Sequence, residues 1–114
     1  MAHNWYKVAD KDVELVKPTL LVSRRVNDKQ LCIGRNQNGY FAVSNTCPHA
    51  GGSLGDGWCD KAGNVVCPLH RYMFNPENGQ SADGRGFYVE PYLVDEREDG
   101  IYVGFPRKKL FGLF

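Results

Sequence analysis

The sequence lacks the features that would place the protein in a membrane or outside the cell. Its longest apolar runs, such as residues 20–22 and 41–43, are far shorter than the roughly 20 residues that span a bilayer. The N-terminus, MAHNWYKVAD, has no charged start followed by an apolar stretch, so it does not read as a secretory signal. We therefore expect a cytoplasmic protein with no membrane partner.

The sequence also has no marked excess of charge of one sign. It holds 14 Lys and Arg against 13 Asp and Glu, which gives a formal net charge of +1. Proteins that neutralise many phosphates usually carry a larger, clustered basic excess, so no nucleic-acid partner is expected. A glycine-rich nucleotide fingerprint is absent as well. The 42% hydrophobic and 24% charged residues suit one folded domain, residues 1–114.

No long window shows helical periodicity, and the chain instead alternates short apolar runs with turn residues. The runs rich in β-branched or aromatic residues predict strands at 5–9, 19–26, 30–34, 40–44, 64–67, 92–94 and 101–104. Turn signals at 36–39 (NQNG) and 98–100 (EDG) predict two hairpins. A single helical turn is predicted at 10–16. The predicted fold class is all-β.

Two segments stand apart from this pattern. Residues 45–86 are rich in Gly, Pro, Asn and Asp, and a connection of this length inside a domain is usually functional. The C-terminal tail, residues 106–114 (PRKKLFGLF), has a basic cluster followed by apolar residues. It is either a last segment packed on the domain or a docking peptide for a partner.

Two short clusters within residues 45–86 carry metal-binding side chains. Cys47 and His49 lie in the first, CPHAGG, and Cys67 and His70 lie in the second, CPLH. Two thiols and two imidazoles in turn-rich loops form a complete ligand set for a centre that holds iron or zinc. Cys47, His49, Cys67 and His70 are therefore the predicted metal ligands. The remaining histidine, His3, is expected to be an exposed polar residue.

The way in which these ligands are paired distinguishes between metals. Zinc fingers commonly take their cysteines as one close pair and their histidines as another, whereas each loop here supplies one of each. A mixed set suits a two-iron cluster in which both thiolates bind one iron and both imidazoles the other. Gly51 and Gly52 would let backbone N–H groups approach and donate to bridging sulfides. A structural zinc module that mediates protein contacts is the alternative of another class.

The motif CPHAGG followed by CPLH resembles the signature of the Rieske [2Fe-2S] family. The strand pattern from residue 5 to residue 104 is likewise similar to that of a soluble Rieske ferredoxin. The resemblance implies an antiparallel β sandwich or barrel with an inserted cluster-binding subdomain at 45–86. It also implies one [2Fe-2S] cluster, with Cys47 and Cys67 on the inner iron and His49 and His70 on the outer, solvent-facing iron.

The chain departs from the Rieske proteins of respiratory complexes at several positions. Those proteins have an extra cysteine in each loop, where this chain has Gly52 and Leu69, so their loop disulfide cannot form here. They also place a Ser and a Tyr near the cluster, where this chain has Tyr72 and Phe74. Phe74 has no donor, and fewer hydrogen bonds leave the reduced state less stabilised. We therefore expect a midpoint potential of about −150 mV rather than +300 mV.

Other positions near the motifs also carry expectations. Arg71 stands where many family members have Gly, and it either interacts with the reduced cluster or a partner, or faces solvent. Residues 83–86 (DGRG) lie near the place of the family's cover loop but lack its proline. Cys32 lies within a predicted strand and is expected to be a small core residue. Cys59 is expected to be a free thiol.

The chain has no residues left for a catalytic metal site. Oxygenases of the family need a mononuclear iron held by two His and a carboxylate, and only His3 remains after the cluster ligands are assigned. We therefore expect an electron carrier and not an enzyme. Its partners would be a reductase and an oxygenase or similar terminal redox enzyme. The alternative is the small Rieske-like subunit of an assimilatory nitrite reductase.

Overall fold

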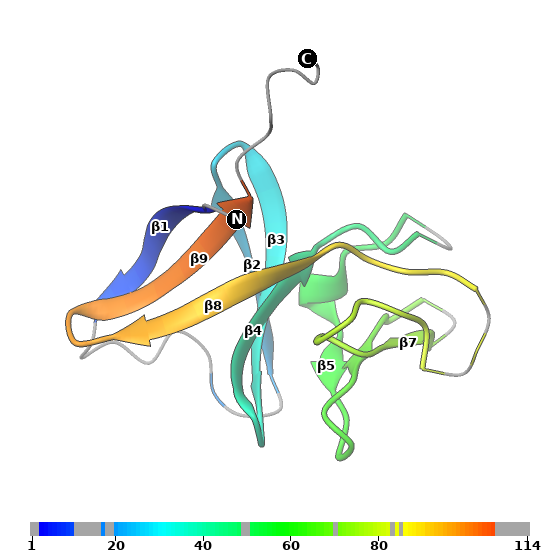
Figure 1. Ribbon diagram of the computed structural model, residues 1–114. Coiled ribbons are helices and arrows are strands. Elements are labelled where there is room, and N and C mark those ends of the chain that lie inside the picture. The colour runs from blue at the N-terminus through cyan, green and yellow to red at the C-terminus, as the bar shows by residue number, and fades with distance from the viewer. Residues whose placement is uncertain are drawn as a thin grey trace.

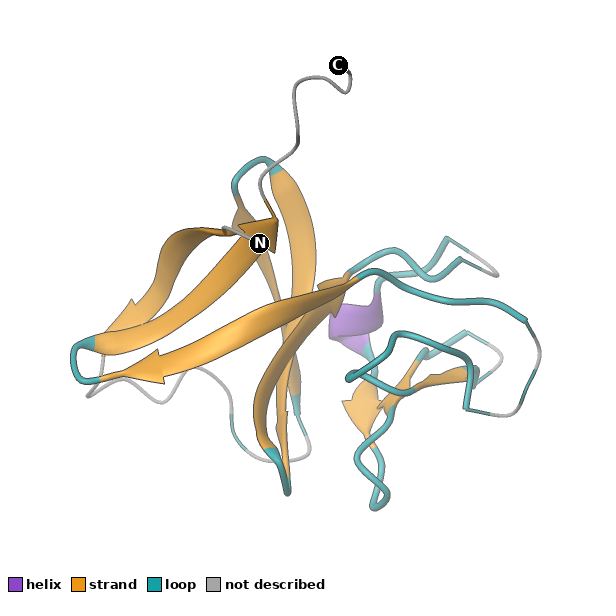
Figure 2. Cartoon of the chain, in the orientation of Figure 1, coloured by secondary structure: helices purple, strands orange, loops and turns teal. Residues whose placement is uncertain are grey.

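The computed structural model describes residues 3–10, 17, 20–48, 51–69, 71–82, 84 and 86–106 of the chain. Strands and loops make up these residues, apart from one short 3-10 turn, η1 (Leu54–Asp56), as Figure 2 shows. Over these ranges no helix has the length and hydropathy that a bilayer crossing requires. The predicted all-β class is confirmed.

Six strands form one antiparallel sheet that curls on itself, and we call it the base sheet (Figure 1). Its strands, in sheet order, are β1 (His3–Asp10), β9 (Gly100–Pro106), β8 (Pro91–Arg97), β4 (Gly39–Ser44), β3 (Lys29–Asn36) and β2 (Leu21–Val26). Each strand runs antiparallel to its neighbours. The antiparallel β architecture implied by the family resemblance is therefore present.

Tight turns join three neighbouring pairs in the base sheet, and the sequence predicted two of them. The turns at 36–39 and 98–100 link β3 to β4 and β8 to β9 as expected. The turn that was missed joins β2 to β3 through Asn27 and Asp28, whose φ angles are +49° and +61°. Positive φ at both central residues is typical of a type I′ turn. Asn and Asp adopt this conformation more readily than most residues, so the Asn-Asp pair was the signal.

The predicted strands are all present, with small differences at their ends. The run predicted at 19–26 forms β2 from Leu21, and Thr19 lies outside the described residues. Asp10, where the helical turn was expected to begin, ends β1, and residues 11–16 lie outside the described residues. The division into one domain, a subdomain at 45–86 and a tail at 106–114 stays a prediction, because residues 107–114 are not described either.

Residues 45–90 lie between the paired strands β4 and β8 and carry a second, small sheet. This sheet has the order β5 (Trp58–Cys59), β6 (Val65–Val66) and β7 (Met73–Phe74). Each of its strands has two residues, which is too short for an alternating pattern to be read, and so β5 and β7 were not predicted. Figure 1 shows the small sheet and its loops beside the β3–β4 part of the base sheet.

Strands β3 and β4 are buried on both faces, because they separate two hydrophobic cores. Leu31 and Ile33 of β3 pack in the core of the base sheet, whereas Cys32 between them packs in the core under the small sheet. In β4, Ala42 faces the first core, and Phe41 and Val43 face the second. This alternation explains why the sequence reads as continuous apolar runs, LCI and FAV, at these strands.

The turn between β3 and β4 also holds the loop that joins β5 to β6. The Asn36 side chain donates from Nδ2 to the Gly63 carbonyl at 3.0 Å, and the Gln37 side chain donates from Nε2 to the Ala62 carbonyl at 3.1 Å. These bonds fix the end of the small sheet that is remote from the predicted ligand loops. The two sheets are therefore joined by hydrogen bonds as well as by a shared apolar core.

Cys32 is fully buried and free, as expected for a small core residue, and Cys59 is also a buried free thiol. Burial raises the pKa of the Cys32 thiol from 9.0 to about 12, and the nearby Cys59 adds to the shift. The unfolded thiol loses its proton near its ordinary value, while the folded thiol keeps it up to the higher pKa. The stability from this difference is present below pH 9.0 and is lost as the pH rises toward 12.

We predict that replacing Cys32 flattens this loss of stability in alkali. Each pH unit above the unfolded pKa costs about 1.4 kcal/mol, so wild type should lose about 2 kcal/mol more than Cys32→Ala between pH 9 and about pH 11. Urea unfolding of both proteins at the two pH values measures the difference. Equal losses in the two proteins would mean that Cys32 titrates normally in the folded state.

Candidate metal centre

The first ligand loop is a hairpin-like turn that begins at Cys47. Thr46 and Ser53 form an isolated β-bridge that closes the loop. Inside it, the Cys47 N–H donates to the Gly52 carbonyl at 2.8 Å, and the Gly51 N–H donates to the Cys47 carbonyl at 2.8 Å. These bonds define a six-residue turn, 47–52, with Cys47 at its first position.

Asn45 anchors this turn to the base sheet from a buried position. Its side-chain Nδ2 donates to Ser53 Oγ at 2.9 Å, and its Oδ1 accepts from the Gly55 N–H at 2.8 Å. Its backbone N–H donates to the carbonyl of Gln30 in β3 at 3.1 Å. Because a buried amide must find partners for its polar atoms, Asn45 fixes one path for the loop. The sequence did not identify this role, since an Asn after an apolar strand signals only a turn.

The second ligand loop repeats this arrangement between β6 and β7. The Cys67 N–H donates to the Tyr72 carbonyl at 2.8 Å, directly after the Val66–Met73 pair of the small sheet. Residues 67–72 therefore form a second six-residue turn, again with a cysteine at its first position. The two predicted cysteine ligands are presented by equivalent backbone geometry.

The two turns are in contact where glycines allow their backbones to approach. A Cβ on Gly52 would lie 2.9 Å from Leu69 Cδ1 and 3.6 Å from Cys67 Sγ, so the first turn rests against the second. A Cβ on Gly57 would overlap the carbonyl oxygen of Val66, the residue before Cys67. Gly52 and Leu69 are the positions of the family's loop disulfide, and they are neighbours here without it.

The Cys47 and Cys67 side chains meet at this contact and are withdrawn from solvent. Their exposed fractions are 1% and 0%, and the two side chains pack in one apolar core. Burial raises the pKa of the Cys67 thiol, the Leu69 backbone N–H donates to it and lowers the pKa, and Cys47 raises it again. Burial of the Cys67 thiol disfavours its ionisation, and a bound metal cation would reverse this by taking the sulfur as a thiolate.

The structure places the two predicted cysteine ligands, whereas His49 and His70 lie outside the described residues. In the sequence they belong to the turns 47–52 and 67–72. Within the described ranges no group of three or more His, Cys, Asp and Glu gathers as a metal site would. The expectation that Gly51 and Gly52 let backbone N–H groups approach bridging sulfides stays a prediction, and the N–H of Gly51 itself donates to the Cys47 carbonyl.

An apolar floor lies beneath the two thiols. Phe74 of β7 is fully buried in the same core as Cys47 and Cys67. Tyr72 and Phe87 pack against this core at its edge, with ring centroids 5.7 Å apart. Phe74 therefore brings no hydrogen-bond donor to the core, as its sequence position indicated.

Arg71 adopts a backbone conformation that ordinarily favours glycine. Its φ angle is +57°, and its side chain is exposed. A left-handed conformation costs a residue with a Cβ about 1–2 kcal/mol, and glycine avoids that cost. This geometry gives a physical reason why many Rieske proteins have Gly at this position.

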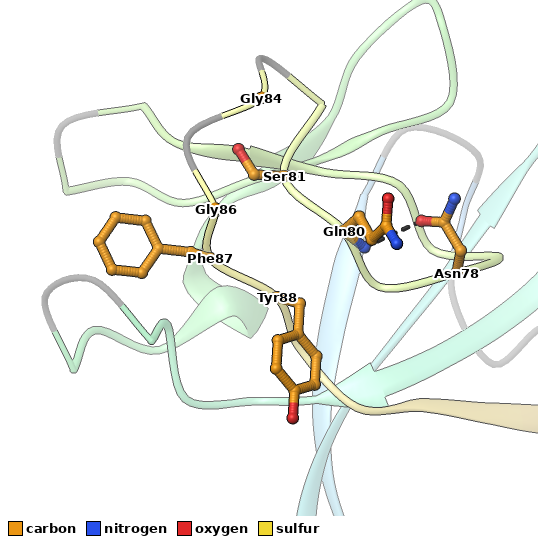
Figure 3. A pocket seen from close by; sticks show the side chains of 7 residues that line it. All are labelled: Asn78, Gln80, Ser81, Gly84, Gly86, Phe87 and Tyr88. Carbon is orange, nitrogen blue, oxygen red and sulfur yellow. Dashed lines mark hydrogen bonds between the residues drawn. The ribbon is translucent and has the colours of Figure 1, made fainter.

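A separate groove of about 530 Å³ lies beside residues 78–88 (Figure 3). It is lined by Asn78, Gln80, Ser81, Gly84, Gly86, Phe87 and Tyr88. Figure 3 shows the Gln80 N–H bonded to Asn78 Oδ1, at 2.9 Å, and the Phe87 ring pointing away from the Tyr88 ring. Neither Cys47 nor Cys67 is among the described residues that line it.

The part of the chain that contains the two turns and their thiols matches a known protein family. The family model of the Rieske [2Fe-2S] domain matches residues 4–87. The chain belongs to this family. Both six-residue turns lie inside the matched range, and the cofactor of the Rieske family is a [2Fe-2S] cluster held by two Cys and two His.

Relatives of two kinds share this domain. The chain is 29% identical over 117 residues to a nitrite reductase [NAD(P)H] of Emericella nidulans, which spans 90% of this chain and 10% of that protein. It is 20% identical over 79 residues to the ferredoxin component of an alkene monooxygenase system of Xanthobacter autotrophicus, with 69% of this chain and 65% of that protein covered. The chain thus spans less than two thirds of either relative.

A solved structure from Mycobacterium tuberculosis has the same fold. It is described as an NADH-dependent nitrite reductase small subunit and superposes with a TM-score of 0.81 at 23% identity. The superposition covers 95% of this chain and all of that one. The curled antiparallel sheet with its inserted loops is therefore the Rieske fold.

The residues present fit a Rieske cluster. Two buried thiols lie in contact, and the Leu69 N–H donates to the thiol of Cys67. Gly52, which has no Cβ, lies next to the Cys67 sulfur. An iron–sulfur cluster requires thiolates in an apolar environment, with N–H groups that donate hydrogen bonds to their sulfurs.

We predict that Gly57→Ala loosens the second ligand loop and lowers cluster content. The new methyl group would overlap the Val66 carbonyl oxygen and press on Pro68, which lies 3.2 Å away on the far side of Cys67. Backbone must move to relieve this overlap, at a cost of about 3 kcal/mol. Urea unfolding and the iron content per chain measure the two effects.

The control for this prediction is Gly84→Ala. Gly84 has a φ of +76°, but a Cβ at this position would meet no atom within 4 Å, so the substitution adds backbone strain without overlap. We expect a loss of only about 1 kcal/mol and unchanged iron content. If both variants behaved alike, close approach at Gly57 would not be what positions Cys67.

Proposed function

We propose that Cys47, His49, Cys67 and His70 ligate the cluster, and that the chain carries single electrons between redox proteins. The observation that carries this proposal is the meeting of two buried cysteine thiols from two equivalent turns. In the sequence, each turn also contains one histidine, at the third position of 47–52 and the fourth of 67–72. The Cys47 and Cys67 thiolates would hold the inner iron and the two imidazoles the outer iron.

The cluster, when bound, supplies a one-electron couple whose centre changes from near neutral to about −1 on reduction. The chain's own residues set the conditions for that change. The core around Phe74 keeps water from the Cys47 and Cys67 sulfurs. The Leu69 N–H donates to the Cys67 sulfur and stabilises negative charge there.

The alkene monooxygenase ferredoxin among the relatives supports a role as a ferredoxin component. Such a component would take an electron from a reductase and deliver it to an oxygenase or similar terminal enzyme. The chain would act without a catalytic mononuclear iron, since its third histidine, His3, lies in β1 of the base sheet. The cellular location that we propose for this carrier is the cytoplasm.

A second candidate function is that of a Rieske-like nitrite reductase small subunit. The relative from Emericella nidulans, which matches 90% of this chain, favours it. The two candidates differ in partner and not in cofactor. Affinity purification of the chain from its own cells distinguishes them: a large haem-containing subunit in stable complex supports the nitrite reductase role, and its absence supports the ferredoxin role.

We predict that removing one ligand from either pair abolishes the cluster while the base sheet remains folded. Purified wild type should contain two irons and two labile sulfides per chain, as expected for one [2Fe-2S] cluster. His70→Ala and Cys67→Ala should lose both, along with the visible absorption. The circular dichroism of the β-sheet should persist, because both residues lie in the inserted loops.

The matched controls change the same residue types elsewhere in the chain. His3→Ala in β1 and Cys32→Ala in β3 should keep the iron, the sulfide and the spectrum. A native spectrum in His70→Ala would reject His70 as a ligand. One zinc and no sulfide in wild type would reject the cluster and favour a structural zinc module.

A further prediction concerns the midpoint potential. Phe74→Tyr puts an O–H into the core that holds the two thiols. A hydrogen bond to the cluster sulfurs favours the more negative, reduced state by about 1 kcal/mol, which raises a one-electron potential by roughly 40 mV. Redox titration of both proteins measures the shift from the wild-type value, which we expect at about −150 mV.

The control is Phe105→Tyr, which makes the same change in the other core, inside the base sheet. Its potential should equal that of wild type. A shift of the same size in both variants would mean that the added phenol acts through general packing and not through a local hydrogen bond.

A further inference from the structure

Two exposed side chains flank position 70 of the second ligand loop. Leu69 is 46% exposed, although its Cδ1 also rests against Gly52 of the first loop. Arg71 on the other side is exposed as well. Pro48 and Pro68, which follow the two cysteines, are exposed too. The described residues around the candidate ligands thus form a surface with an apolar part and one cation.

The turn that presents Cys67 places Arg71 in a left-handed conformation, which glycine would adopt with less strain. The other non-glycine residues with positive φ are Asn27 and Asp28, which form a tight hairpin turn suited to their short polar side chains. The described residues offer Arg71 neither a hydrogen bond nor an ion pair. An exposed charged side chain at a position where glycine would be less strained is a candidate for a contact outside the chain.

The Arg71 side chain is exposed to solvent. A planar fork of N–H donors matches a carboxylate in bidentate geometry.

We infer that Arg71, with Leu69 beside it, docks a carboxylate on an acidic face of the redox partner. This inference rests on the proposed function, because it supposes that electrons pass through the loops that carry Cys47 and Cys67. The partner surface that fits is an apolar patch with an acidic rim. The arginine side chain steers that surface toward the ligand loops, and Leu69 provides the apolar contact.

The test uses two electron acceptors that differ in charge and share one fold. Native cytochrome c is basic, and succinylation of its lysines makes it acidic. The reduced holoprotein is mixed with each acceptor in a stopped-flow instrument at low and high ionic strength. At low ionic strength, Arg71→Gln should lower the second-order rate constant with the acidic acceptor roughly three- to tenfold. The rate constant with the basic acceptor should not fall.

Matched variants separate charge from strain. Arg71→Lys should retain most of the rate with the acidic acceptor, and Arg24→Gln, an exposed arginine on β2, should match wild type. Arg71→Gly should lose the rate as Arg71→Gln does, yet should unfold at a higher urea concentration because the φ strain is relieved. High ionic strength should bring all rate constants together.

Each outcome bears on the inference. Unchanged rate constants in Arg71→Gln, or equal losses with both acceptors, would overturn a charge-complementary docking role for Arg71. If Arg71→Gly were more stable than wild type but reduced the acidic acceptor at the same rate, the Arg71 side chain would have no role in docking at this surface. A wild-type protein without a cluster spectrum would instead overturn the proposed function, so the two failures are distinguishable.

Discussion

The contact between two buried thiols, Cys47 and Cys67, is the constraint on which the rest of the inserted region depends. The two side chains come from turns that are 20 residues apart in the sequence, and both are removed from water. Burial raises the pKa of the Cys67 thiol, which disfavours its thiolate form in the absence of a bound cation. In the ligand set that we propose, a [2Fe-2S] cluster would offset this, because its iron would take both sulfurs as thiolates in that dry environment.

The base sheet provides the rigid frame for this contact. Its central strands β3 and β4 carry one core on each face, and one of these cores contains the cysteines. Asn45 ties the first turn to β3, and the Asn36 and Gln37 side chains tie the small sheet to the β3–β4 turn. The loops are therefore held at both ends, which keeps the sulfurs in place while an electron arrives and leaves.

Strands with several alternating residues could be predicted from the sequence, because their apolar side chains repeat with a period of two. The two-residue strands β5 and β7 could not, since their pairing is set by the loops around them. The four candidate ligands could be predicted because Cys and His at matched spacings are rare outside metal sites. Two of them, Cys47 and Cys67, are placed by the structure, and the ligand set as a whole remains a proposal.

The features of the candidate metal centre that the sequence did not reveal depend on contacts between residues far apart in the chain or on the geometry of a turn. Gly57 matters because its Cα lies against the Val66 carbonyl, and nothing near Gly57 in the sequence indicates that approach. The strain at Arg71 follows from the geometry of its turn, and the sequence shows only a residue that differs from the usual Gly. The Gly51 N–H donates to the Cys47 carbonyl within its own turn, which the sequence does not indicate.

The most direct test of the central claim is pulsed electron paramagnetic resonance of the reduced protein, grown with nitrogen-15 histidine. The account predicts a paramagnetic di-iron centre coupled to two histidine nitrogens, with both couplings lost when His49 and His70 are replaced. A cluster without nitrogen coupling, or a protein that contains zinc and gives no signal, would contradict it.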